Sequence, residues 1–181
     1  FAFYRGTAQI MAADLSTTPN VGLTVQLCGD AHLSNFGLYA SPERRLVFDL
    51  NDFDETLEGP WEWDLKRLVT SFTIAARHRE LDRHQILRTT RRVVETYREA
   101  MRDFAGWCTT DIWYSHISED DYLAFTDHKS TLKRAKRTVA KAKAKHSGQA
   151  LDRLAEDVDG RYRIRSEPPL LVPLRQLDEQ R

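Results

Sequence analysis

One stretch, residues 27–64, constrains what this chain can fold into more than any other, because it joins strand-like residues to an excess of carboxylates. Between Gly29 and Asp64 there are nine acidic residues and two basic ones, whereas the formal net charge of the whole chain is zero. Like charges near a core repel one another and lose hydration. A divalent cation or a cationic partner would relieve that cost, so the stretch predicts a functional site.

Short extended segments are expected to carry this stretch. Residues 21–28 are rich in β-branched and apolar side chains and predict a short buried strand that ends at Asp30. Residues 36–40 and 44–50 flank the turn-forming residues 41–43, and this arrangement predicts a β-hairpin. The polar residues of the stretch are therefore expected at strand ends and turns.

Helices are predicted for most of the remaining chain, because apolar side chains recur at intervals of three and four residues. A pair of helices at 61–79 and 83–105 is expected to be core scaffold. The expected fold class is α+β, mostly helical, with a short strand and a β-hairpin carrying the acidic site. The other expected elements are helices at 5–17, 127–147 and 150–158 and a strand at 161–165.

The order of polar residues in the stretch fits phosphoryl transfer. That chemistry needs a carboxylate to orient or deprotonate the attacking hydroxyl, and oxygen ligands that hold Mg²⁺ against nucleotide phosphates. Asp30 fits the first role, and Asn35 and Asp52 fit the second. Asp54 is expected to add to Asp52 or replace it as a metal ligand, and Asp49 is a second-rank candidate. The structural alternative is a turn in which Asp and Asn side chains satisfy backbone donors.

Two motifs carry a resemblance to known kinases. GDAHLSN resembles the GDLHPGN catalytic loop of aminoglycoside-phosphotransferase-like kinases, and LVFDLNDFDE resembles the strand and metal-binding Asp that follow it. Asp64, in EWDLKRL, matches the later structural Asp of that pattern. The resemblance implies Asp30 as catalytic base, with His32 shaping the catalytic loop. It implies Asn35 and Asp52 as Mg²⁺ and nucleotide ligands, Mg²⁺ and ATP as cofactors, and a partial large lobe of a protein-kinase-like fold.

A wider resemblance covers most of residues 1–126. FAFYRGTAQIMAADL, QLCGDAHLSNFG, SPERRLVFDLNDFDET and GPWEWDLKRL are similar to a bacterial family known as domain of unknown function 2252. Residues 1–126 are accordingly expected to form the kinase-like large-lobe core, and 127–181 a basic helix and C-terminal extension of the same domain. No glycine-rich loop precedes Asp30, so we expect the nucleotide-gripping half to lie in sequence outside this chain, and the chain alone to be inactive.

Three functions are compatible with these residues, and whether the chain is an enzyme is left open. The first is a kinase-like phosphotransferase that passes phosphate from Mg-ATP to an unknown hydroxyl substrate. The second is a metal-dependent phosphoesterase built on the same residues. The third is a non-catalytic, pseudokinase-like binding module, which would bind its ligand whether or not Asp30 is ionised.

Charge and hydropathy narrow the expected partners and location. The segment 127–147 holds eight Lys or Arg residues against one Asp, without interleaved aromatic or glycine residues, which favours a solvated helix over a nucleic-acid surface. The expected partner is a small-molecule or unknown hydroxyl substrate. No apolar run approaches the roughly 20 residues that cross a bilayer, so no membrane partner and a cytoplasmic location are expected. Arg5 and Lys66 are expected to form salt bridges with the acidic stretch.

Overall fold

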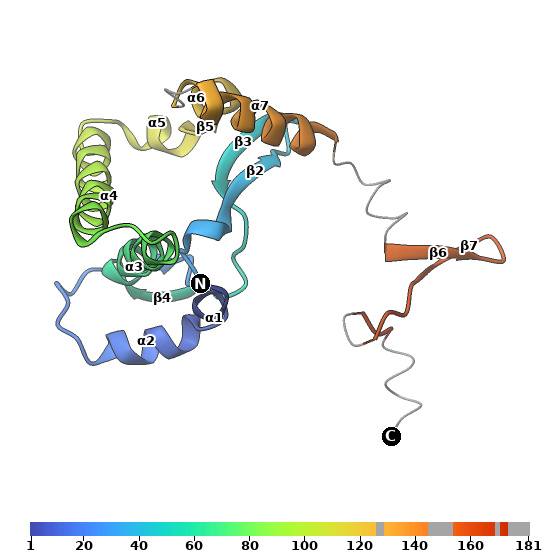
Figure 1. Ribbon diagram of the computed structural model, residues 1–181, viewed down its shortest axis with the longest axis horizontal. Helices are drawn as coiled ribbons and strands as arrows, with labels where there is room; N and C mark the ends of the chain where they lie inside the picture. Colours follow the sequence, from blue (N-terminus) through green and yellow to red (C-terminus); the bar gives the residue numbers. More distant parts are fainter. Residues whose placement is uncertain (126–128, 145–153, 169–170, 174–181) are drawn as a thin grey trace. The chain divides into compact units, whose positions relative to one another are not determined.

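The computed structural model describes residues 1–125, 129–144, 154–168 and 171–173, and the chain divides into two compact units, Phe1–Tyr122 and Leu123–Arg181. Helices and small antiparallel sheets make up the described residues (Figure 1). The predicted α+β class is therefore confirmed. The assignment of both segments to one domain stays a prediction.

The elements follow one another along the chain as Figure 1 labels them. The first unit begins with α1 (Ala2–Arg5), α2 (Ala8–Ser16), β1 (Thr24–Leu27), the short 3₁₀ turn η1 (Leu33–Asn35), β2 (Phe36–Ala40), β3 (Leu46–Leu50) and β4 (Leu57–Pro60). It continues with α3 (Glu62–His78), α4 (Arg83–Phe104), α5 (Thr109–Tyr114), β5 (Ile117–Ser118) and the start of α6 (Glu119–Ala124). The second unit holds α7 (Lys129–Ala144), β6 (Ala155–Val158) and β7 (Arg161–Ile164).

The strand that leads to Asp30 belongs to a two-stranded sheet. β1 pairs antiparallel with β4, with Leu27 opposite Leu57. Leu27 is buried, but the other three residues of β1 are exposed. The strand predicted over 21–28 is therefore confined to 24–27, and the prediction that it is buried is wrong for 21–26. The strand β4 was not predicted either, because Gly59 and Pro60 are typical of a break in secondary structure. Gly59 suits the strand because a Cβ there would lie 2.8 Å from Leu27 Cδ1.

The predicted hairpin is confirmed and forms a second sheet in the order β2, β3, β5. Phe36 pairs with Leu50, so the residues that flank this pair meet at the open end of the hairpin. There the backbone N–H of Asn51 donates to the carbonyl of Asn35 at 2.9 Å. On one face, the ring of Phe48 stacks on the rings of Phe36 and Tyr122. The hairpin thereby brings the GDAHLSN motif next to the acidic residues that follow β3.

The two long helices predicted from periodicity are confirmed as α3 and α4, which pack side by side (Figure 1). A capping box between Asp82 and Gln85 begins α4. The hydroxyls of Thr73 and Thr90 lie 3.0 Å apart across the pair. None of the helices in the described part of the chain combines the length and apolar character that crossing a bilayer requires.

Two predicted helices differ from the structure. The helix expected at 5–17 spans only Ala8–Ser16. Ala2–Arg5 forms a separate short helix, which ends at its C-cap residue Gly6. The helix expected at 150–158 is wrong for its described end, where Ala155–Val158 is a strand paired with β7. Asp159 and Gly160 both have positive φ, which suits a tight hairpin turn. Residues 150–153 lie outside the described residues. The basic helix expected at 127–147 is confirmed as α7 for 129–144, its other residues lying outside the described ones, and the strand expected at 161–165 is confirmed as β7.

Candidate functional site

Asp30 lies in the loop that follows β1, and Gly29 allows the backbone to turn just before it. Gly29 has φ of +83°, a left-handed conformation that side chains other than glycine rarely adopt. A Cβ at this position would lie 1.8 Å from the backbone oxygen of Glu55. Glycine therefore allows the chain to turn while pressed against the segment between β3 and β4. The turn leaves Asp30 buried, with 8% of its surface exposed.

Asp64, in the first turn of α3, anchors the same loop. Its Oδ2 accepts a hydrogen bond from the Cys28 N–H at 2.8 Å, and its Oδ1 accepts one from the Gly29 N–H at 3.1 Å. A carboxylate is also stabilised at a helix N-terminus. The predicted role of Asp64 as a structural anchor is confirmed. Burial, followed by the charge of Asp64, raises the pKa of the Cys28 thiol to about 12.

Cys28 is expected to resist alkylation in the folded protein. Its thiol is buried and its pKa is raised to about 12, so the reactive thiolate stays a minor form well below that pH. Cys108 is exposed. With iodoacetamide at pH 8, mass spectrometry should show Cys108 modified and Cys28 protected, and both should react after unfolding in urea. Equal modification of the two thiols in the folded protein would contradict this environment for Cys28.

Both carboxylate oxygens of Asp30 have partners. Arg67, on α3, donates from Nε to Oδ1 of Asp30, and its Nη2 forms an ion pair with the same oxygen. Nε2 of His32 lies 3.3 Å from Oδ2. Arg67 is 2% exposed, so this is a buried ion pair between α3 and the loop. The carboxylate is thus held in one orientation, with its charge balanced by the guanidinium.

The N-terminal helices complete the surroundings of Arg67. Its Nη2 also donates to the backbone carbonyls of Tyr4 at 3.1 Å and Arg5 at 3.4 Å. The guanidinium lies over the Tyr4 ring, 4.6 Å from the centroid. The Tyr4 hydroxyl donates to the Arg67 carbonyl at 2.8 Å and to Met11 Sδ at 3.1 Å. The loop, α1, α2 and α3 therefore meet at one arginine.

Sequence reasoning missed Arg67 and considered Arg5 and Lys66 instead. Within the described residues, neither of those side chains forms an ion pair with the acidic stretch, so that expectation is wrong. Lys66 donates to Thr18 Oγ1 at 3.4 Å, and Arg5 contributes its carbonyl. The sequence did contain a signal for Arg67. Residues three apart on a helix share a face, and Arg67 follows Asp64 by three residues. Because Asp64 was already expected at the loop, Arg67 could have been expected on the same side of α3.

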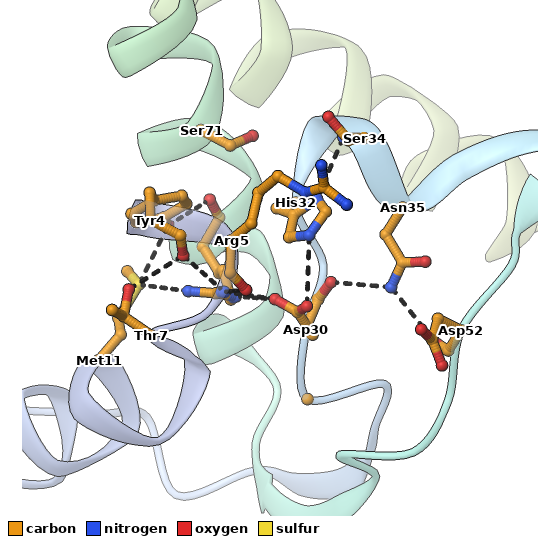
Figure 2. A network of polar contacts seen from close by, with 12 residues as sticks. Tyr4, Arg5, Thr7, Met11, Asp30, His32, Ser34, Asn35, Asp52 and Ser71 are labelled. Carbon is orange, nitrogen blue, oxygen red and sulfur yellow. Dashed lines mark hydrogen bonds and ion pairs between the residues drawn. The ribbon is translucent and has the colours of Figure 1, made fainter. Parts of the chain in front are cut away.

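His32 shapes the loop through both ring nitrogens. Its Nδ1 accepts the Ser34 N–H at 3.1 Å, so in the neutral ring the proton is on Nε2, which faces Asp30 (Figure 2). The backbone turns tightly here, since the His32 N–H donates to the Asp30 carbonyl at 2.8 Å. The next residue is tied to α3, where Oγ of the fully buried Ser71 accepts the Leu33 N–H at 3.0 Å. His32 therefore contacts the Asp30 carboxylate and helps to fix its orientation.

Asn35 joins the loop to the acidic segment after β3. Its Nδ2 donates to the Asp30 carbonyl at 3.1 Å and to the Asp52 carbonyl at 3.2 Å, and Figure 2 shows the amide between these residues. Both amide hydrogens are thereby used. Oδ1 accepts no hydrogen bond from the described residues and remains an oxygen donor for a ligand. The backbones of Asp30 and Asp52 thus meet at the buried side chain of Asn35.

The carboxylates after β3 are exposed and act on one another. Burial raises the pKa of Glu55, and so do a hydrogen bond with Asp54 and the negative charges of Asp30, Asp54 and Asp52. These four carboxylates are therefore electrostatic neighbours. Sequence reasoning gave Glu55 no role of its own. Asp49 lies within β3, and its Oδ1 accepts the N–H of the next residue at 2.7 Å.

The predicted metal ligands are Asn35, Asp52 and Asp54. In the described residues, no group of three or more His, Cys, Asp or Glu side chains converges as a metal cluster. The predicted set is of a different kind, since it combines one amide oxygen with two exposed carboxylates. These are hard oxygen donors of the type that Mg²⁺ prefers, and Mg²⁺ commonly keeps several water ligands. The residues fit the ion chemically, and the metal site stays a prediction.

Comparison with known proteins identifies one family. A family model described as an uncharacterised protein conserved in bacteria (DUF2252) matches residues 1–181. No curated protein matches the chain, and no solved structure matches it.

Proposed function

The chain belongs to the DUF2252 family of uncharacterised bacterial proteins, and we propose that its acidic loop is the catalytic half of a kinase-like phosphotransferase. The proposed reaction transfers the terminal phosphate of ATP to a hydroxyl of a small molecule. Asp30 is the proposed base, and His32 orients it. Asn35, Asp52 and Asp54 would hold Mg²⁺, which neutralises phosphate charge during such transfers.

The observation that carries this proposal is the double hydrogen bond of the Asn35 amide. It ties the backbone of the proposed base to the backbone of the proposed metal ligand Asp52. A phosphotransferase needs its base and its metal ligands on opposite sides of one phosphoryl group, held rigidly. A buried amide between two loops supplies that rigidity and leaves Oδ1 of Asn35 as a further ligand.

The contacts of Asp30 suggest which oxygen would take the proton. Oδ1 accepts a hydrogen bond from Arg67 Nε and forms an ion pair with Arg67 Nη2, whereas the single contact of Oδ2, with His32, is longer at 3.3 Å. In the proposed step, an acceptor hydroxyl gives its proton to Oδ2 as its oxygen bonds to the terminal phosphorus. The bond between that phosphorus and the bridging oxygen breaks, and ADP leaves with the electron pair.

Nucleotide binding tests the proposal. Calorimetry on the full-length protein should detect binding of Mg-ATP, and Asp52→Ala should abolish it, because a metal ligand is lost while the backbone carbonyl that Asn35 contacts remains. Asp49→Ala is the matched control: its side chain is exposed, belongs to the same acidic stretch and should leave binding unchanged. Absence of nucleotide binding in the unaltered full-length protein would contradict the proposal.

A second candidate, a non-catalytic binding module, is favoured by the partners of Asp30. Both of its oxygens are occupied, and a base that is already paired with a buried arginine is poorly placed to accept a proton. Asp30→Asn separates the two functions. A phosphotransferase should lose transfer by orders of magnitude while it retains Mg-ATP binding. A binding module should show no transfer before the substitution and unchanged ligand binding after it.

A further inference from the structure

A cavity of about 360 Å³ lies between α2, the β1–β4 pair and the first turns of α3. Figure 1 shows these elements close together in the first unit. This volume falls within the range of small-molecule sites, which are mostly apolar with a few convergent polar groups. The apolar wall is made largely by Met11, Ala12, Leu15, Leu27, Leu57 and Trp63. Asp30, Asn35 and Asp52 do not line the cavity, but Arg67, which pairs with Asp30, does, so the cavity adjoins the proposed phosphotransfer site.

The charged residues at one end of the cavity decide what kind of ligand it suits. Glu55, Asp64 and Arg67 line this end. The positive charge of Arg67 is already balanced by Asp30, and its N–H groups donate to Asp30 and to backbone carbonyls. Asp64 uses both oxygens to hold the loop, as described above. The excess charge at this end is therefore negative, and an anionic ligand would be repelled.

Glu55 is the carboxylate that remains open to a ligand. Its side chain is exposed and lies near the negative charges of other carboxylates, an arrangement that a cation would stabilise. A bare metal ion would gain little from the apolar wall opposite. An organic cation satisfies both ends of the cavity, and the indole of Trp63 adds an aromatic face that favours a nearby positive charge.

We propose that this cavity binds a small organic amine, with its hydrocarbon body against α2 and Trp63 and its ammonium group at Glu55. The contact between ammonium and carboxylate supplies selectivity for charge, and the apolar wall supplies most of the affinity. The inference does not depend on phosphotransfer, since neither Glu55 nor Trp63 has a role in that reaction.

Three probes of one shape and different charge test this inference on the full-length protein. They are 2-phenylethylamine, the neutral 2-phenylethanol and the anionic phenylacetate, followed by saturation-transfer NMR and titration. The amine should bind most tightly, the alcohol about fivefold more weakly and the acid not measurably, as expected for one partly exposed ion pair. Equal binding of all three probes, or tighter binding of the acid, would overturn the assignment of a cation site.

Two substitutions locate the binding. Glu55→Gln should weaken the amine about fivefold and leave the alcohol unchanged, because only the charge is removed. Glu58→Gln is the matched control, since Glu58 is exposed on β4 and does not line the cavity. Ala12→Phe should fill the cavity and abolish binding of both probes. If no probe binds the unaltered protein, another part of the protein or a partner covers the cavity and the proposal is wrong.

Discussion

Replacing Arg67 by alanine is expected to destabilise the protein by about 3–5 kcal/mol, the usual cost of leaving one member of a buried ion pair without its partner. Asp30 and Arg67 are 8% and 2% exposed, so water cannot replace the lost contacts without opening the loop. Two backbone carbonyls of the N-terminal helices would also lose their donor. The N-terminal helices, the loop and α3 should therefore loosen together.

A double-mutant cycle measures this pair directly. Urea unfolding of Arg67→Ala, Asp30→Asn and the double variant should give a double effect well below the sum of the single effects, because the second substitution removes the charge that the first left unpaired. Arg67→Lys should fall between the unaltered protein and Arg67→Ala, since lysine keeps the charge and loses the planar fork.

Arg77→Ala is the control for this cycle. Arg77 is exposed on the same helix, and its loss should change the free energy of unfolding by no more than about 0.5 kcal/mol. An Arg67→Ala effect as small as the control, or a strictly additive double variant, would mean that the ion pair does not hold the loop.

Replacing Gly29 by alanine is the second substitution from which we expect a large effect. Its φ of +83° is costly for alanine, by roughly 1 kcal/mol. The new Cβ would also lie 1.8 Å from the Glu55 carbonyl oxygen, and a backbone atom cannot rotate away as a flexible side chain can. The loop would have to shift, and the hydrogen bond from the Gly29 N–H to Asp64 would shift with it.

Gly22 separates the two causes of this effect. It has φ of +77°, close to that of Gly29, but a Cβ there would meet nothing within 4 Å. Gly22→Ala should therefore cost only the backbone term of about 1 kcal/mol. Gly29→Ala should cost at least about 2 kcal/mol more, as overpacking against rigid atoms does. Thermal unfolding compares the two variants, and equal shifts in Tm would show that no close approach exists at Gly29.

The parts of the site that sequence reasoning predicted are those set by local spacing. Asp30, His32 and Asn35 lie within six residues, so a single tight loop was bound to bring them together. The hairpin turn brought the segment after β3 back to Asn35, and the turn-forming residues 41–43 between two strand-like segments were visible in the sequence. The anchor role of Asp64 came from the resemblance of EWDLKRL to the kinase pattern.

The parts that sequence reasoning missed depend on packing between distant segments. β4 contains glycine and proline and has little strand character of its own, yet it forms because β1 offers a partner. Ala155–Val158 resembles a helix in composition and becomes a strand through its pairing with β7. Glu55 gained a role because its backbone and side chain lie beside the loop and the cavity, which no spacing along the chain indicates.

The sequence by itself determined the class of fold, the long helices, the hairpin and the loop that presents Asp30 and Asn35, because periodicity and turn chemistry act between neighbours in the chain. Only the tertiary structure decided which cation balances Asp30. Many basic side chains were available, and the choice of Arg67 follows from the helix face that packs on the loop and from the carbonyls of α1 that complete its hydrogen bonds. Because both groups are buried, loss of Arg67 would leave the Asp30 charge without water or a partner, and the protein would lose stability.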